Sequence, residues 1–305
     1  MAKTASPRAP TVGIVAPSGY VPDGATIDRA AQVFAGRGWR VQASDTCFGK
    51  HERFAGSDDL RAAELQRFCT DSALGLVLAA RGGYGLTRVL DRLDFASIRA
   101  ADRLICGYSD FTAFNLAYLA RAGGVSLHGP SATDFGAEHP NAFTIDTFFE
   151  TIDRLRAGGD FHAGFDADGP AASVRGTLWG GNLALVCALL GTPYFPRVRG
   201  GILFVEDVNE PAYKIERMLV QLEQAGVLAR QRAILLGRFD PVTPMPNDNG
   251  FSLDGVVARL RQRLGCPVVT GLPFGHVARK LTLPIGARVG LRVVGGQAHL
   301  TATLR

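Results

Sequence analysis

The 305-residue sequence lacks the patterns that mark several large classes of protein. No apolar run approaches the roughly 18 residues of a membrane span, and the first ten residues contain no apolar segment of the kind found in a secretory signal. Basic residues form no cluster, and the net charge of +5 is spread along the chain. We therefore expect a cytoplasmic protein that binds neither nucleic acid nor a membrane.

Cysteine is scarce and scattered. The five cysteines are an odd number, form no CxxC pair and lie far apart in the sequence. Several of them occur in apolar stretches, which is typical of buried thiols in a reducing compartment. The HExxH motif, the G-x-G-x-x-G motif and the P-loop motif are all absent, so we expect no metal and no cofactor.

The composition is that of a globular protein, with 47% hydrophobic and 20% charged residues. In the N-terminal half, short apolar runs alternate with longer amphipathic segments. This alternation predicts a parallel β-sheet covered by helices. Strands are expected at 11–17, 39–44, 74–80, 103–107 and 125–128, and helices at 27–37, 58–68, 112–122 and 141–156.

A glycine-rich stretch at 157–170 interrupts the apolar pattern and indicates a domain boundary. We predict an N-terminal domain at 1–157, a linker at 158–170 and a C-terminal domain at 171–305. The second half is also predicted to be α/β. Its strands are expected near 173–178, 201–205 and 233–237, its helices at 183–190, 211–225 and 254–264, and a closing hairpin at 289–294 and 298–304.

The loops that follow the predicted strands are the first candidates for a site, because open α/β sheets bind ligands beyond the carboxyl ends of their strands. Gly107-Tyr108-Ser109 lies at such a strand-to-helix turn, where a nucleophilic serine can expose its hydroxyl. The second glycine of the nucleophile elbow is missing, since Phe111 stands in its place. On spacing alone, a role for Ser109 or Asp110 as the N-cap of the next helix is the commoner one.

Three other features of the sequence also allow both a functional and a purely structural interpretation. Gly82 and Gly83 could present backbone N–H groups to a ligand, although a simple turn is the commoner use of glycine. Glu206 ends an apolar strand and needs a partner if it is buried. His276 lies between glycine and proline residues, and a loop histidine is more often structural than catalytic. Asn182 is favoured as a helix cap.

Six segments, taken together, resemble the LD-carboxypeptidase family of serine peptidases (muramoyltetrapeptide carboxypeptidases). Each segment alone is a weak signal, but the set spans nearly the whole chain in order, with no departure at the key positions. The segments are GIVAPSG at 13–19, RGGYG at 81–85, GYSDFT at 107–112, WGGNL at 179–183, LFVEDVNEPAYKIERML at 203–219 and GHVARKLTLPIG at 275–286.

The resemblance implies a fold and a catalytic triad. The fold is a flavodoxin-like parallel-sheet N-terminal domain with a swivelling-domain-like α/β C-terminal domain, assembled as a homodimer. The triad has Ser109 as the nucleophile, His276 as the base and Glu206 as the acid. A tetrahedral intermediate also needs two oxyanion donors; the backbone N–H of Asp110 is one candidate, and that of Gly83 or Gly82 is the other.

The expected function is therefore release of the terminal D-Ala from murein tetrapeptides, in peptidoglycan recycling. Gly82, Arg81 and Trp179 are the expected substrate contacts. One alternative is an immunity-type amidase of the same superfamily that cleaves aminoacyl-nucleotide toxins; an added aromatic loop would favour it, and Trp179 and Tyr213 do not decide. A non-catalytic module that binds a muropeptide or sugar is an alternative of another class, and an intact triad argues against it.

Overall fold

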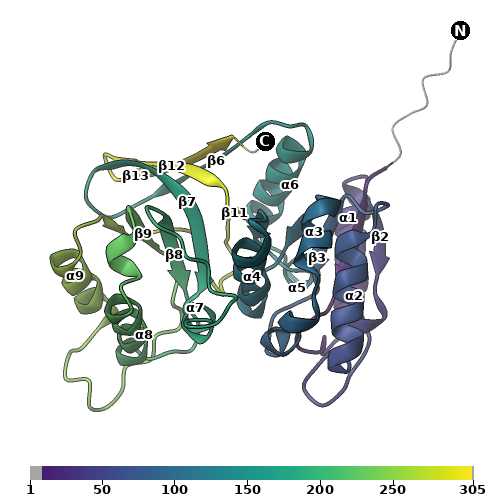
Figure 1. The fold of residues 1–305 in the computed structure, drawn as a ribbon, viewed down its shortest axis with the longest axis horizontal. Helices are drawn as coiled ribbons and strands as arrows, with labels where there is room; N and C mark the ends of the chain where they lie inside the picture. Colours follow the sequence, from purple (N-terminus) through teal and green to yellow (C-terminus); the bar gives the residue numbers. More distant parts are fainter. Residues whose placement is uncertain (1–8, 304–305) are drawn as a thin grey trace, which may run out of the picture. The chain divides into compact units, whose positions relative to one another are not determined.

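The structure, a computed structural model, describes residues 9–303 and is of the mixed α/β class (Figure 1). The chain divides into two compact units. Unit 1 contains the chain up to Gly107 together with Ser131–Pro140. Unit 2 contains Tyr108–Pro130 and the chain from Asn141 onward.

Unit 1 is built on parallel strands, as the sequence predicts. They are hydrogen-bonded in the order β4-β3-β1-β2, and every neighbouring pair is parallel. The strands are β1 (Thr11–Val15), β2 (Arg40–Ala43), β3 (Leu76–Ala79) and β4 (Leu104–Cys106). The helices are α1 (Ala25–Gly36), α2 (Asp58–Thr70), α3 (Phe95–Ala101) and α5 (Ala132–Phe135).

Local signals explain where these elements lie. β1 and β3 are apolar and buried along nearly their whole length, which is typical of parallel strands covered on both faces. Helix α2 begins after Ser57, whose hydroxyl accepts a hydrogen bond from the N–H of Leu60 at 3.2 Å, as expected of an N-cap. Because β1 and β3 are parallel, the loops that follow them leave the same edge of the sheet.

Unit 2 contains a mixed sheet in the order β10-β9-β8-β7-β12-β13-β6. Its strands are β6 (Asp160–Asp166), β7 (Ala172–Asn182), β8 (Ile202–Glu206), β9 (Ala233–Leu236), β10 (Val268–Val269), β12 (Arg288–Val294) and β13 (Gln297–Thr303). A further antiparallel pair joins β5 (Ser126–His128) and β11 (Leu283–Ile285). The helices are α4 (Thr112–Ala122), α6 (Ala142–Arg156), α7 (Leu183–Ala188), α8 (Ala212–Gln224) and α9 (Leu253–Arg263).

The long strand β7 joins the parallel and antiparallel parts of this sheet. Residues 172–177 pair antiparallel with β12, and residues 178–182 pair parallel with β8. The last residues of β7 and β8, Asn182 and Glu206, are directly paired in that register. β7 therefore delivers a polar side chain beside Glu206.

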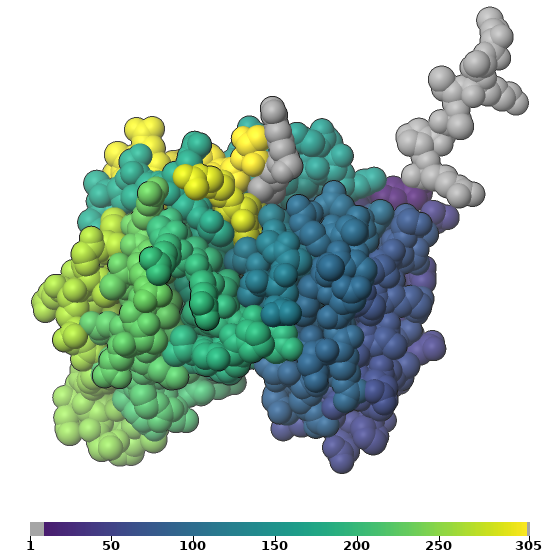
Figure 2. Space-filling model, in the orientation of Figure 1, coloured from purple at the N-terminus to yellow at the C-terminus, as the bar shows by residue number. Residues whose placement is uncertain are grey.

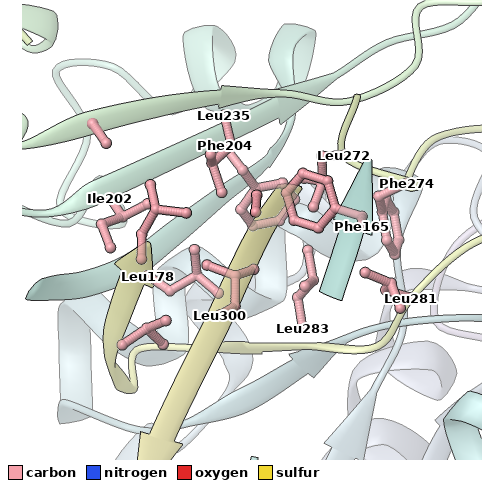
Figure 3. Packing of buried hydrophobic residues seen from close by; sticks show 14 of the residues in the cluster. Phe165, Leu178, Ile202, Phe204, Leu235, Leu272, Phe274, Leu281, Leu283 and Leu300 are labelled. Atoms are coloured by element: carbon pink, nitrogen blue, oxygen red, sulfur yellow. The ribbon is translucent and has the colours of Figure 1, made fainter. Parts of the chain in front are cut away.

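The apolar core of unit 2 fixes the position of β8. Figure 3 shows part of this cluster, which draws on strands of both parts of the sheet and on the loop before His276. Phe204 of β8 and Phe274 of that loop are both fully buried in it. The labelled members are Phe165, Leu178, Ile202, Phe204, Leu235, Leu272, Phe274, Leu281, Leu283 and Leu300.

Two features differ from the sequence prediction. The expected linker at 158–170 contains strand β6, which pairs with β13 and buries Phe161 and Phe165. In addition, 108–130 belongs to the same compact unit as the C-terminal half. The reason is tertiary packing, because α4 contacts α7, β7 and β11, and β5 pairs with β11.

The placement of β8 predicts the effect of a core substitution. Ile202 is fully buried in this strand, so Ile202→Ala should lower the free energy of unfolding by about 2–5 kcal/mol. The measurement is urea unfolding followed by circular dichroism. Val294→Ala is the control, since Val294 is 49% exposed and its truncation should cost less than about 0.5 kcal/mol. Equal losses in both variants would contradict this placement.

Candidate active site

Ser109 lies on the turn between β4 and α4, in a backbone conformation that few serines adopt. Its φ of +62° is in the left-handed region, and a short 3₁₀ turn, Ser109–Phe111, runs directly into α4. For a residue with a side chain this conformation costs about 1–2 kcal/mol, so its surroundings must hold it there. The Ser109 hydroxyl bonds to His276 and does not cap α4. The N-cap interpretation of Ser109 is therefore wrong.

Ser109, His276 and Glu206 form a continuous hydrogen-bonded chain within unit 2. The distance from Ser109 Oγ to His276 Nε2 is 2.8 Å, and that from His276 Nδ1 to Glu206 Oε2 is also 2.8 Å. An ionised carboxylate can only accept hydrogen bonds, so Nδ1 of His276 carries the ring proton and donates a hydrogen bond to Glu206. His276 Nε2 is then free to accept the hydrogen bond of the serine hydroxyl.

Glu206 is completely buried at the end of β8. Its Oε2 is bound by His276, whereas its Oε1 has no hydrogen-bond partner among the residues that the structure describes. Burying a carboxylate is costly unless it is paired, and the imidazole of His276 supplies that pairing. The side chain of His276 is itself 19% exposed, so the chain leads from a buried acid to an accessible base.

A polar network ties the strand ends to the helix that follows Ser109. Asn182 Nδ2 donates to Asp207 Oδ1 at 2.9 Å, and the backbone N–H of Asn182 donates to Thr112 Oγ1 at 3.1 Å. Burial raises the pKa of the Asp207 carboxyl, while the hydrogen bonds that it accepts act in the opposite direction. The network holds the turn at Ser109 and the strand end at Glu206 in one arrangement.

The glycine before Asn182 is required by close packing. Gly181 has a φ of +134°, and a Cβ there would lie 2.7 Å from Thr112 Oγ1 and 2.8 Å from His128 Cε1. A side chain at this position would therefore push α4 away from β7. Asn182 also accepts a hydrogen bond from the N–H of Leu185 at 3.2 Å, which confirms the prediction that it caps a helix.

Tyr108 and Lys280 form one side of the surroundings of His276. The ring centroids of Tyr108 and His276 are 5.2 Å apart, and Tyr108 packs edge-to-face on Phe274 at 5.9 Å. The buried Lys280 donates from Nζ to Tyr108 Oη at 3.1 Å. Neither residue is singled out by the sequence analysis, although each lies in a segment that also holds a triad residue.

His128 is completely buried beside this cluster, and it is neutral. Its Nδ1 accepts a hydrogen bond from Asn115 Nδ2 at 3.3 Å, which leaves the ring proton on Nε2. Burial, followed by electrostatic interaction with His276 and Lys280, lowers the pKa of His128 to about 3.

The expected substrate and oxyanion residues Arg81, Gly82 and Gly83 lie in unit 1, in the loop after β3. Gly82 accepts a hydrogen bond from the N–H of Gly19 at 3.2 Å, and Gly83 has a φ of +109°. Arg81 Nη1 donates to the carbonyl oxygen of Tyr20 at 2.8 Å. Their roles, and that of the Asp110 N–H in unit 2, stay predictions.

The structure does not support Trp179 as a substrate contact. Its side chain is completely buried, and its Nε1 donates to Gln231 Oε1 at 2.9 Å. The indole also packs edge-to-face on Phe195. Trp179 is therefore a core residue of unit 2, and the glycines that follow it serve the packing of the strand end.

Residues 9–303 contain no group of three or more His, Cys, Asp or Glu side chains placed to hold a metal ion. In the same part of the chain, no helix is both long enough and apolar enough to cross a membrane. Cys47, Cys69 and Cys106 are buried, as expected from their apolar surroundings. Burial raises the pKa of the Cys47 thiol to about 11.

Two family models match this chain. The model of the LD-carboxypeptidase N-terminal domain matches residues 12–129, and that of the LD-carboxypeptidase C-terminal domain matches residues 175–291. A probable murein peptide carboxypeptidase of Bacillus subtilis is 31% identical over 293 residues, covering 96% of this chain and 92% of the relative.

Solved structures of similar proteins agree with these matches. The crystal structure of muramoyltetrapeptide carboxypeptidase from Oxalobacter formigenes superposes with a TM-score of 0.89 at 40% identity, covering 96% of this chain and 99% of that one. The microcin C7 self-immunity protein MccF superposes with a TM-score of 0.88 at 22% identity, covering 97% and 96%. At that identity the second similarity concerns the fold alone.

The buried neutral His128 predicts a pH dependence of stability. An unfolded histidine takes up a proton near pH ~6.5, whereas folded His128, with a pKa of about 3, does not. The unfolded state therefore binds more protons below pH ~6.5, and the free energy of unfolding should fall by about 2 kcal/mol from this residue between pH ~7 and pH ~5. Urea unfolding at the two pH values measures the fall.

His128→Gln should lose that part of the pH dependence, whatever its stability at neutral pH. Ile202→Ala is the control, because it is destabilised but keeps His128 and should therefore keep the wild-type change with pH. An unchanged pH dependence in His128→Gln would show that the pKa of His128 is the same in the folded and unfolded states, which would contradict its lowered pKa.

Proposed function

This chain belongs to the LD-carboxypeptidase family and is a serine-type carboxypeptidase, and we propose that it releases the terminal D-Ala from murein tetrapeptides through Ser109, His276 and Glu206. The observation that carries the proposal is the hydrogen-bonded chain of these three side chains, with both contacts at 2.8 Å. A free serine is a poor nucleophile at neutral pH, and an adjacent base activates it.

In the first half of the proposed reaction, Ser109 Oγ attacks the carbonyl carbon of the bond before D-Ala. His276 Nε2 takes the hydroxyl proton as the new bond forms, and then gives it to the departing amine of D-Ala. In the second half, His276 takes a proton from water, and the hydroxide attacks the acyl group on Ser109. The serine recovers its proton from His276, and the shortened peptide leaves.

Glu206 acts through His276 in both halves. It holds the proton on Nδ1, so that Nε2 faces Ser109, and it stabilises the imidazolium that forms in each step. Because Glu206 is buried at the end of β8, its charge acts on the imidazole with little screening by water.

The tetrahedral intermediates carry a negative oxygen that needs donors. We assign the backbone N–H of Asp110 as one donor and that of Gly83 as the other. Loss of one such donor typically costs about 10²–10³ in kcat. Arg81 and Gly82 are proposed to receive the terminal carboxylate of the peptide, which would restrict the enzyme to removal of a single residue. The homodimer and the cytoplasmic location stay predictions.

Neither alternative function has a comparable observation in its favour. A non-catalytic module needs no serine within 2.8 Å of an imidazole that is bound to a buried carboxylate. The amidase alternative rests on the fold that this chain shares with MccF. Trp179, an aromatic residue that could have stacked a nucleobase, is buried. The choice between peptide and nucleotide substrates is made by the assay below.

The role of Ser109 predicts the result of its removal. Ser109→Ala should fold as the wild type does and lower kcat for a murein tetrapeptide by about 10⁴–10⁶, because binding and oxyanion stabilisation remain without a nucleophile. Release of D-Ala is measured by mass spectrometry, and folding by circular dichroism. Ser173→Ala, at an exposed position of β7 in the same unit, is the control and should keep full activity. A Ser109→Ala enzyme with wild-type kcat would rule out the serine mechanism.

The proposed specificity predicts a difference among closely related peptides. Misplacing a carbonyl by ~1 Å can cost about 10² in rate, so a site shaped for an L-centre followed by one D-residue should discriminate strongly. A tetrapeptide that ends in L-diamino acid–D-Ala should be cleaved. A matched peptide that ends in L-Ala should resist, and so should a pentapeptide that ends in D-Ala–D-Ala.

The three peptides are compared by chromatography and mass spectrometry at equal concentration, beside an aminoacyl-sulfamoyl nucleotide. Equal cleavage of the L-Ala peptide would remove the stereochemical assignment. Cleavage of the nucleotide alone would select the amidase.

A further inference from the structure

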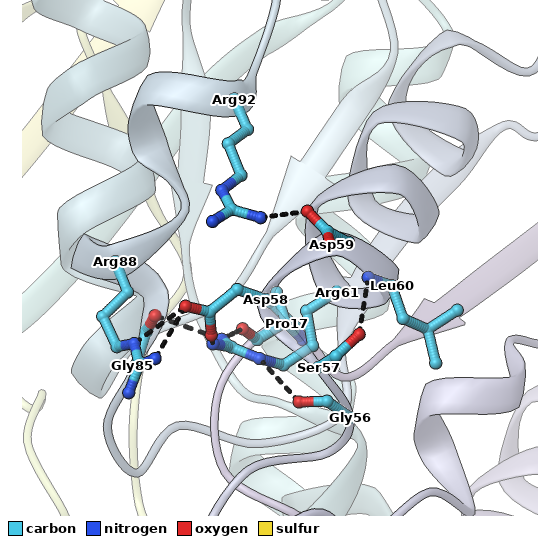
Figure 4. Close-up of polar contacts among 10 residues, drawn as sticks. All are labelled: Pro17, Gly56, Ser57, Asp58, Asp59, Leu60, Arg61, Gly85, Arg88 and Arg92. Carbon is cyan, nitrogen blue, oxygen red and sulfur yellow. Dashed lines mark hydrogen bonds and ion pairs between the residues drawn. The ribbon is translucent and has the colours of Figure 1, made fainter.

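The guanidinium of Arg61 is completely buried in unit 1, although Arg61 belongs to the surface helix α2. Figure 4 shows it among Pro17, Gly56 and Gly85, which come from three different loops. Nη1 donates to the carbonyl oxygen of Pro17 and, at 3.1 Å, to that of Gly85, and Nε donates to the carbonyl oxygen of Gly56 at 3.3 Å. One planar group thus holds three segments of backbone.

The charge of Arg61 is balanced beside these contacts. Its Nη2 bonds to Asp58 Oδ1 at 2.5 Å, and the other oxygen of Asp58 accepts from Arg88 Nε at 2.9 Å. Both guanidinium groups also lie 4.8 Å from the ring centroid of Phe54. Replacing a buried ion pair by apolar residues is often neutral or stabilising, so stability alone does not account for a buried arginine here.

The two loops joined by Nη1 are those that leave the carboxyl ends of β1 and β3. A second contact ties them, because the N–H of Gly19 donates to the carbonyl oxygen of Gly82 at 3.2 Å. Gly85 has a φ of +128°, and a Cβ there would lie 2.7 Å from the Phe54 ring and 3.1 Å from Arg61 Nη1. The glycine is what lets the guanidinium reach its carbonyl.

The loop that Arg61 holds leaves the sheet beside the strand that leads to the nucleophile. In unit 1, β4 runs parallel to β3 with Leu78 paired to Cys106, and Ser109 is three residues beyond Cys106 in the chain. Gly83, whose N–H is the proposed second oxyanion donor, lies between the ends of this loop that are fixed at Gly82 and Gly85.

We propose that Arg61 is a positioning residue of the active site, which sets the conformation of the Gly82–Gly85 backbone and so the direction of the Gly83 N–H. The inference rests on the proposed function, since it assigns Arg61 to the oxyanion hole of that reaction. The planar fork suits this task, because it donates to several carbonyls in fixed directions, whereas a lysine ammonium is a single flexible point of charge.

The test compares Arg61→Met and Arg61→Lys with the wild type, at a temperature well below the unfolding midpoint of each protein. With a murein tetrapeptide, Arg61→Met should lower kcat by about 10²–10³, as expected for a lost oxyanion donor, while KM changes by less than about threefold. Arg61→Lys should fall between Arg61→Met and the wild type. The affinity for a peptide boronate, which forms a tetrahedral adduct with the serine, should fall in parallel with kcat, whereas that for the tripeptide product should not.

Arg103→Met is the matched control. Arg103 also donates to a backbone carbonyl in unit 1, that of Leu74 at 3.2 Å, but at the amino-terminal edge of β3. Its loss should leave kcat within about twofold of the wild type at an equal fraction of folded protein. If Arg61→Met does not fold, Arg61→Lys and the boronate affinities decide.

A folded Arg61→Met or Arg61→Lys with wild-type kcat and wild-type boronate affinity would overturn the proposal, even if its unfolding midpoint is lower. Failure of the proposed function has a different signature. In that case the wild type itself cleaves none of the murein peptides. The role of Arg61 is then tested only by comparing the affinity of the wild type and of the Arg61 variants for the peptide boronate.

Discussion

The hydrogen bond between Glu206 and His276 is the interaction on which the site depends. A carboxylate at the buried end of β8 has lost its water, and a partner must compensate for that loss. His276 supplies it at 2.8 Å, and the bond in turn fixes the ring proton on Nδ1. Only then can Nε2 accept from Ser109, whose own backbone is held in a strained turn. The apolar packing around Phe204 and Phe274 therefore helps to position both the strand that carries Glu206 and the loop that carries His276.

Much of this fold could be predicted, because its signals are local. The apolar period places a helix at 112–122, which is the extent of α4, and the apolar run at 201–205 marks β8 to within a residue. The need of Glu206 for a partner also followed from that run. The residues of the triad could be singled out together only through the family resemblance, since nothing local in the chain says which distant side chains meet.

The rest depends on tertiary contacts that local patterns do not report. Trp179 precedes two glycines and is therefore expected from the sequence to contact a substrate. In the structure its side chain is buried and bonds to Gln231, which is 52 residues away in the chain. The sequence of strand β6 contains glycine and charged residues and gives no clear strand signal. Only Phe161 and Phe165 of this strand are buried. Arg61 escaped notice because an arginine on a surface helix is expected to face water.

The separation of 167 residues between Ser109 and His276 has a consequence for biosynthesis. At about 5–20 residues per second, a ribosome that has made the serine needs roughly 8–33 s more to make the histidine. Throughout that interval the growing chain carries Ser109 without the imidazole that we propose as its base. In the proposed mechanism, the chain therefore gains its hydrolytic activity only after the segment that carries His276 has been made and has folded.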